Sequence, residues 1–126
     1  MSETYISVDI EASGPIPGAY SMLALGACLV SDIKETFYAE LWPINSASVP
    51  AAMSVVGKSL ADFVQTGSDP LTVMGNFRSW ILKAQKETKP VFVGFNASFD
   101  WSFVNWYFCT YLGSNPFGVG GVDSGH

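Results

Sequence analysis

Apolar and polar residues follow two different periods along this chain, and the change between them predicts its secondary structure. Residues 5–10 alternate loosely and are rich in β-branched side chains, which is typical of a central strand. An apolar run over residues 22–30 and a second alternating stretch over residues 36–42 predict two further strands. Because the connections between these three segments are short, we expect an antiparallel meander.

After this meander the apolar residues change to helical spacing. We expect a short helix over residues 50–56 and a second helix that begins at Ser59. Asp69 followed by Pro70 resembles an N-cap with proline at the first helical position, which predicts a longer helix that ends near residue 87. The middle of the chain is therefore expected to be helical.

The last third of the chain predicts one more strand and one more helix. A short apolar stretch over residues 91–95 reads as a buried strand, and Asn96 can cap a helix that ends near residue 112. Residues 113–126 are expected to form a glycine-rich tail. The predicted order of elements is three strands, then helices, then one strand and one helix. This order predicts a single α/β domain over residues 1–126, with a mixed sheet whose first strand is central and whose fourth lies parallel beside it.

Composition and charge narrow the class of protein. The chain has 126 residues, of which 48% are hydrophobic, and this suits one domain with a real core. The longest apolar run is too short to span a bilayer, and no basic cluster precedes an apolar stretch at the N-terminus. Cys28 and Cys109 match no metal or redox spacing, so we expect a cytoplasmic protein with reduced thiols and no membrane partner. The net charge of −5 argues against a broad basic nucleic-acid surface, but not against an enzyme that meets phosphates through bound metal.

Asp9 and Glu11 are unusual because they interrupt an otherwise apolar strand. Residues two apart on a strand point to the same face, so the two carboxylates are expected to project together. Adjacent carboxylates repel and raise each other's pKa unless a cation lies between them. Taken alone, the pair fits the solvent face of a surface strand equally well.

Asp100 is a third carboxylate in an unusual setting. It stands four residues after Asn96, so both would lie on one face of the first helical turn, near the positive end of the helix dipole. Aromatic residues flank Asp100, and a lone carboxylate avoids such surroundings; a capping or salt-bridged aspartate is the alternative. If the fourth strand pairs beside the first, three carboxylates converge at one end of the sheet, where their oxygen donors suit Mg²⁺ or Mn²⁺.

Two motifs resemble those of a known family. D-x-E on the first strand, followed by S-G and then SMLALGACLV, resembles the first motif of the DEDD-type 3′-to-5′ exonucleases, and GFNASFDWSFV is similar to their second. The intervening residues resemble the linking helices of the oligoribonuclease-like and proofreading members. This resemblance implies a ribonuclease H-like fold and metal-dependent hydrolysis at the 3′ end of single-stranded DNA or RNA. It also implies that Asp9 bridges two metal ions, that Glu11 holds the water-bearing ion, and that Asp100 holds the other.

The same resemblance implies contacts with the substrate and shows that one motif of the family is missing. The main chain at Ala12 and Ser13 would contact the terminal nucleotide, and Asn96 and Phe99 would hold its sugar or base. The family's third motif is a histidine followed five residues later by an aspartate, and the histidine acts as general base. The only histidine in this sequence, His126, is its last residue and a poor match. We therefore expect a C-terminally truncated domain with weak or absent nuclease activity.

Two other interpretations remain open, and one surface is expected to be bare. Without the third motif, the chain could be a non-catalytic nuclease-like domain that binds nucleic-acid ends or a protein partner. Residues 52–59 fit a loose form of the phosphate-binding P-loop, although Pro50 precedes it and its loop residues are bulky.

The helix over residues 99–108 contains six aromatic residues on nearly all of its sides. We expect part of it to be exposed and to mediate homo-oligomerisation.

Overall fold

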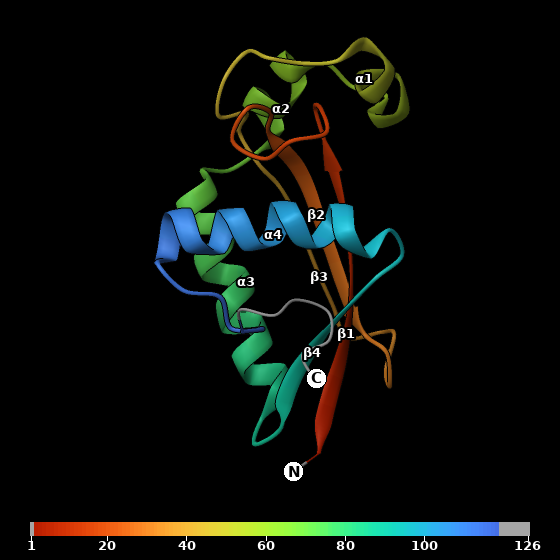
Figure 1. Ribbon diagram of the computed structural model, residues 1–126, viewed down its shortest axis with the longest axis vertical. Helices are drawn as coiled ribbons and strands as arrows, with labels where there is room; N and C mark the ends of the chain where they lie inside the picture. Colours follow the sequence, from red (N-terminus) through yellow and green to blue (C-terminus); the bar gives the residue numbers. More distant parts are fainter. Residues whose placement is uncertain (1, 119–126) are drawn as a thin grey trace.

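The computed structural model describes residues 2–118 and contains a four-stranded mixed sheet (Figure 1). Three strands, β1 (Glu3–Ala12), β2 (Met22–Leu29) and β3 (Thr36–Glu40), form an antiparallel meander. The fourth strand, β4 (Lys89–Gly94), pairs parallel with β1, so the order across the sheet is β3-β2-β1-β4. The predicted meander, the central first strand and the parallel fourth strand are all confirmed.

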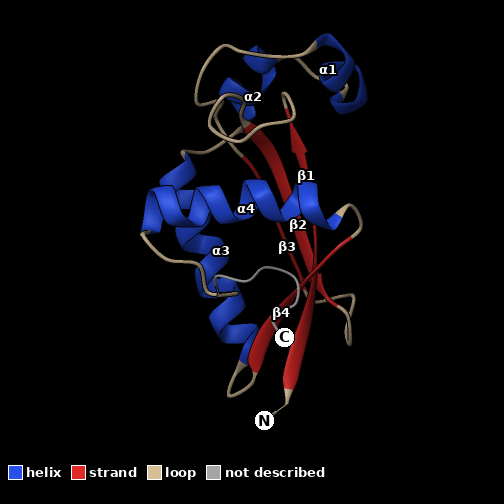
Figure 2. Cartoon of the chain, in the orientation of Figure 1, coloured by secondary structure: helices blue, strands red, loops and turns tan. Residues whose placement is uncertain are grey.

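Four helices follow the predicted pattern closely. They are α1 (Pro50–Val56), α2 (Leu60–Thr66), α3 (Pro70–Gln85) and α4 (Ala97–Leu112). The two long helices, α3 and α4, pack on one face of the sheet, whereas α1 and α2 form a small pair beyond one end of it (Figure 2). Among residues 2–118, none of the helices has the length and apolar character that a membrane crossing requires.

The core lies between the sheet and the two long helices. In β1, every second residue is buried in this core: Ile6, Val8, Ile10 and Ala12. Because successive side chains of a strand point to opposite faces, the residues between them point away from the core. Asp9 and Glu11 are such residues, so both carboxylates share the open face of the sheet, as their spacing predicts.

Residues 113–118 do not form a free tail. Phe117 is buried, and its ring centroid lies 5.3 Å from that of Phe92 in β4 and 6.4 Å from that of Trp101 in α4. The segment is glycine-rich, as predicted, but its aromatic side chain returns to the core. Residues 119–126 lie outside the described part of the chain.

The aromatic helix α4 is better covered than its sequence predicts. Phe103, Tyr107 and Phe108 are fully buried, and the Tyr107 hydroxyl accepts a hydrogen bond from the backbone N–H of Met22 at 2.8 Å. The helix's other aromatic residues between positions 99 and 108 are half-buried. The sheet and α3 cover one side of the helix, and Phe117 packs against Trp101, so its aromatic residues are covered more fully than expected, although three remain partly exposed. Homo-oligomerisation through residues 99–108 stays a prediction.

Residues 52–59 do not form a phosphate-binding loop. Residues 52–56 belong to α1, which ends before Gly57 in the left-handed conformation (φ 81°), and Ser59 caps the next helix, α2. The Lys58 ammonium forms an ion pair with Glu40 at 3.0 Å and lies 4.5 Å from the centroid of the Phe63 ring. The P-loop interpretation is wrong, because a helix occupies the place of the loop and the lysine is held by a carboxylate.

Candidate active site

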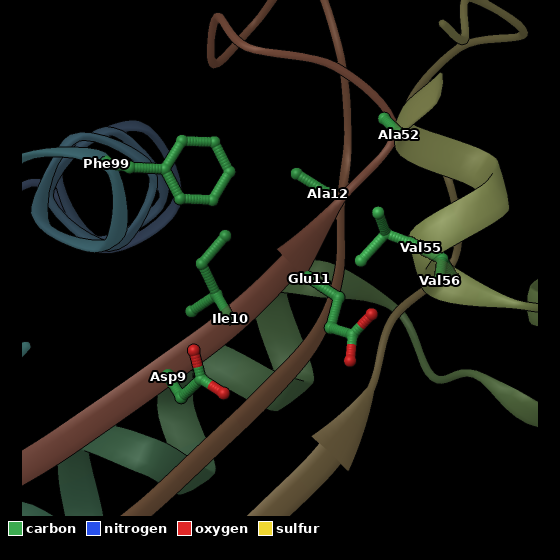
Figure 3. A pocket seen from close by; sticks show the side chains of 8 residues that line it. All are labelled: Asp9, Ile10, Glu11, Ala12, Ala52, Val55, Val56 and Phe99. Atoms are coloured by element: carbon green, nitrogen blue, oxygen red, sulfur yellow. The ribbon is translucent and has the colours of Figure 1, made fainter. Parts of the chain in front are cut away.

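A pocket of about 320 Å³ lies where the C-terminal end of β1 meets α1 and the first turn of α4 (Figure 3). Four of the predicted site residues line it: Asp9, Glu11, Ala12 and Phe99. The other lining residues are apolar: Ile10 from β1 and Ala52, Val55 and Val56 from α1. The pocket therefore has two carboxylates at the end of the strand and apolar walls from two helices.

Asp9 and Glu11 are exposed, and no donor or cation among residues 2–118 pairs with either side chain. Partial burial raises the pKa of the Glu11 carboxyl, and the neighbouring charge of Asp9 raises it further. These are two uncompensated negative charges on one sheet face. By donor type and charge, the pair suits a hard divalent cation.

Asp100 is buried and fixed by two backbone hydrogen bonds. Its Oδ1 accepts from the N–H of Ile10 at 3.3 Å, and its Oδ2 accepts from the N–H of Asn96 at 3.2 Å. The parallel pairing of β1 with β4 ends at Val8 and Gly94, so β4 no longer runs beside β1 at Ile10. The Asp100 carboxylate takes the place of a strand neighbour there and ties α4 to β1. Asp100 therefore caps its helix, which was one of the alternatives that its sequence setting allowed. It forms no ion pair in the described chain.

Asp9 links the other two carboxylates electrostatically. Burial is the first cause that raises the pKa of Asp100, the two backbone hydrogen bonds oppose it, and the charge of Asp9 adds to it. The same charge also raises the pKa of Glu11. Within residues 2–118, however, no group of three or more His, Cys, Asp or Glu side chains is close enough to hold one metal ion. The structure brings the carboxylates together in pairs around Asp9.

Asp100 retains the capacity to bind a cation despite its hydrogen bonds. Each oxygen of a carboxylate has two lone-pair sites, and each Asp100 oxygen uses one of them on a backbone N–H. The second site of each oxygen has no partner among residues 2–118, and the residue is only 1% exposed. By donor type the carboxylates of Asp9, Glu11 and Asp100 suit Mg²⁺ or Mn²⁺, but within residues 2–118 they do not form one metal-holding group.

Gly94 is a site residue that the sequence motifs did not single out. A Cβ at this position would lie 2.9 Å from the Cα of Ala97 and 3.1 Å from Oδ2 of Asp100. Only glycine lets the end of β4 and the first turn of α4 approach closely enough for the carboxylate to sit where it does. The sequence indicates this role of Gly94 through its position, two residues before the N-cap of α4.

Ser13 and Asn96 lie close to the pocket but do not line it. The N–H of Ser13 donates to Ser21 at 2.9 Å, and its C=O accepts from Val49 at 2.8 Å, so both main-chain groups are engaged within the fold. The side chain of Asn96 is exposed and makes no capping hydrogen bond. Their substrate contacts stay predictions. His126 lies outside the described residues.

Comparison with known proteins agrees with the motifs. No protein-family model matches the chain. The 3′-5′ DNA exonuclease Cap18 of Escherichia coli is 52% identical over 122 residues, which are 96% of this chain and 65% of that protein. Product-bound exonuclease I superimposes on 93% of this chain with a TM-score of 0.72 at 16% identity, over 27% of its own length. The zinc-bound complex of E. coli exonuclease I with single-stranded DNA also has a TM-score of 0.72, at 15% identity, over 93% of this chain and 25% of its own.

The structural similarity and the sequence similarity support different conclusions. At such low identity the solved structures establish the shared fold, and the predicted ribonuclease H-like mixed sheet is confirmed. The curated relative establishes homology along nearly the whole chain, although the chain spans only 65% of that relative's length. The chain is therefore homologous to a protein named a 3′-5′ DNA exonuclease, and it shares its fold with exonuclease I.

Proposed function

We propose that this protein is a divalent-metal-dependent 3′-to-5′ exonuclease that acts on single-stranded DNA. The observation that carries the proposal is the pocket at the end of β1, where Asp9 and Glu11 face solvent without a partner. The relative that is 52% identical is named a 3′-5′ DNA exonuclease, which supports DNA over RNA as the substrate. A cytoplasmic location and the choice between Mg²⁺ and Mn²⁺ stay predictions.

The pocket offers different chemistry to different parts of a nucleotide. Figure 3 shows Phe99 on one side and the α1 side chains, among them Val55, on the other, with the end of β1 between them. These apolar walls suit the faces of a sugar and a base. The carboxylates of Asp9 and Glu11 suit a cation that accompanies the phosphate. A terminal nucleotide therefore fits with its base against the walls and its phosphate towards β1.

The chain's own residues would bind and orient in this reaction. When bound, divalent ions supply an activated water and charge that stabilises the leaving oxygen. Asp9 and Glu11 provide oxygen ligands, and Asp100 provides another from a position fixed by the N–H groups of Ile10 and Asn96. Phe99 excludes water from one wall of the pocket. Because Asp9 and Glu11 repel a phosphate on their own, we expect DNA binding at this pocket to require the cation.

The direct test is nucleotide release from a 3′-labelled single-stranded oligonucleotide in Mg²⁺ or Mn²⁺. Glu11→Gln is expected to lower the rate by about a hundredfold or more, because it removes a ligand charge at the reacting phosphate. Glu87→Gln makes the same chemical change at an exposed position after α3 and should leave the rate unchanged. Equal activity of the wild type and Glu11→Gln, or release from the 5′ end, would contradict the proposal.

One observation favours a second candidate function, a non-catalytic domain that binds nucleic-acid ends or a protein partner. In the described residues the three carboxylates do not form one metal-holding group, and both oxygens of Asp100 already accept backbone hydrogen bonds. Calorimetric titration with Mn²⁺ separates the two functions. A nuclease site is expected to bind two ions, whereas a binding domain would take up one weakly or none and would still retain labelled DNA or protein.

A further inference from the structure

Phe95 is the most exposed large hydrophobic side chain of the described residues. It is 99% exposed and stands between the end of β4 and Asn96, the N-cap of α4. Single exposed apolar residues are common on protein surfaces and need no explanation by themselves. What makes the exposure of Phe95 informative is its position in the chain, between β4 and the helix that carries Asp100.

The exposure of Phe95 follows from the start of α4. Phe95 precedes the N-cap, and an apolar residue at that place commonly packs against the fourth residue of the helix. In α4 the fourth residue is Asp100, whose carboxylate is turned to the backbone N–H of Ile10. Phe95 therefore lacks the apolar partner that its own helix would normally supply, because that position holds a site residue.

The register of the sheet brings the start of the connection between β4 and α4 close to β1. The last parallel pair of β1 and β4 joins Val8 to Gly94, and the residues that follow are Asp9 on one strand and Phe95 on the other. The connection from β4 to α4 therefore begins just beyond the level of Val8, four residues before β1 ends at Ala12. Phe95 does not line the pocket, but it directly follows the residue that pairs with Val8, and Val8 directly precedes Asp9 of the pocket.

The pocket has no basic side chain with which to hold a polynucleotide. None of its eight lining residues is lysine or arginine, and two are carboxylates. A single strand that enters such a site must gain affinity from contacts to its bases, in addition to any cation at the carboxylates. Aromatic stacking provides such contacts for every base, because every base has a π-face.

We propose that Phe95 is a base-stacking residue that holds the nucleotide next to the one in the pocket and so positions the 3′ end at Asp9. This inference rests on the proposed function and adds a substrate contact to it. Stacking is non-ionic and tolerant of sequence, so it acts on any single strand. Phe95 would act on binding and not on the chemical step.

The first experiment compares variants of the protein in steady-state release of nucleotides from single-stranded DNA. Phe95→Ala is expected to raise KM by about tenfold, the lower part of the range for one stacked base, and to leave kcat nearly unchanged. Phe95→Trp should retain the wild-type KM. Ile33→Ala removes a side chain that is 73% exposed in the turn between β2 and β3 and should change neither constant.

The second experiment removes bases instead of the ring. Oligonucleotides that lack one base at successive positions from the 3′ end are given to the wild type and to Phe95→Ala. At the stacked position, loss of the base should raise the wild-type KM to that of Phe95→Ala and should have no further effect on the variant. At all other positions the tenfold difference between the two proteins should persist.

Three results would overturn the stacking role while the proposed function stands. These are an unchanged KM in Phe95→Ala, a difference that persists with every abasic oligonucleotide, and a thermal midpoint lowered by more than about 3 °C. The last would show that protein, not DNA, covers the ring. If the wild type releases no nucleotide and binds no single strand, the proposed function and this inference fail together.

Discussion

The two helices that wall the pocket are held in place very differently. In α4, which has 16 residues, Asp100, Phe103, Val104, Tyr107 and Phe108 are buried. In α1, which has seven residues, none is buried, no side chain caps the N-terminus, and Val55 is 84% exposed. One wall of the candidate site is thus part of the core, and the other lies on the surface.

This difference suits the two tasks that the walls would have. Helices much shorter than about 12 residues are marginal on their own, so α1 depends on its attachments at each end. These are the hydrogen bond from Val49 to Ser13 before the helix and the ion pair of Lys58 with Glu40 after it. We expect the α4 wall to fix the carboxylate of Asp100 and the α1 wall to adjust to the bound nucleotide at low cost in free energy.

The largest expected effect on stability comes from a substitution in α4, the more deeply buried of the two helices. Phe103→Ala removes a fully buried ring from α4 and should lower the free energy of unfolding by about 3–5 kcal/mol. Val55→Ala shortens a mostly exposed side chain of α1 and should change it by less than about 0.5 kcal/mol. Urea denaturation followed by circular dichroism measures both. Similar losses in the two variants would show that α1 is as firmly packed as α4.

A second substitution acts where α4 meets the sheet. Gly94→Ala places a Cβ against Ala97 and the Asp100 carboxylate and should destabilise the protein by about 1–3 kcal/mol. Gly75→Ala is the matched control, because a Cβ in that turn of α3 meets nothing within 4 Å. Replacing a helical glycine there should stabilise the protein by about 0.5–1 kcal/mol. The comparison fails if both alanines have the same sign of effect on the urea midpoint.

The third prediction concerns the carboxylates between the two walls. Asp9→Asn removes a charge that raises the pKa of both Glu11 and Asp100, so both pKa values should fall. A carboxyl with a raised folded pKa stabilises the fold fully below its unfolded pKa, and this stabilisation is lost as the pH rises through the folded value. Asp9→Asn should therefore stabilise the protein more at neutral pH than in acid, where all three groups are protonated.

Carbon-13 resonances of the side-chain carboxyls give both pKa values directly, and urea denaturation at the two pH values gives the change in stability. Glu3→Gln, at the other end of β1, is the control for a general change in net charge. If Glu11 and Asp100 titrate at the same pH with and without Asp9, the three carboxylates do not form one electrostatic unit.

The smallest expected effect concerns the attachment of α1. Lys58→Ala removes a partly exposed ion pair with Glu40 and should lower the free energy of unfolding by less than about 1 kcal/mol. It should also leave the affinity for nucleoside triphosphate unchanged, because no phosphate loop surrounds the lysine. Thermal denaturation and fluorescent-nucleotide titration measure the two quantities. A strong loss of nucleotide binding would revive the P-loop interpretation.

Much of the fold could be predicted because its local signals agree with its tertiary structure. Asp69 does cap α3, with its side chain accepting from the N–H of Leu71 at 3.0 Å, and Ser59 does cap α2. The alternation in β1 placed Asp9 and Glu11 on one face correctly, because side-chain direction in a strand is a matter of geometry alone.

The structural features that the sequence did not predict depend on contacts between segments far apart in sequence. Phe117 sits among glycines and turn residues, so nothing local indicates that it packs against Phe92 and covers α4. The bonds of Asp100 to Ile10 and Asn96 depend on where β4 ends, which the sequence predicts only to within a few residues. The need for Gly94 follows from that same close approach.

The hydrogen bond between Ile10 and Asp100 gives the protein a built-in spectroscopic reporter. Its donor is a backbone amide buried in β1, while its acceptor is an oxygen of Asp100, a carboxylate that the proposed function assigns to cation binding. Any redistribution of electron density on that carboxylate must alter the shielding of the amide proton. Under the proposed function, the arrival of an ion would therefore be visible in a single main-chain resonance, with no label on the nucleic acid and no turnover.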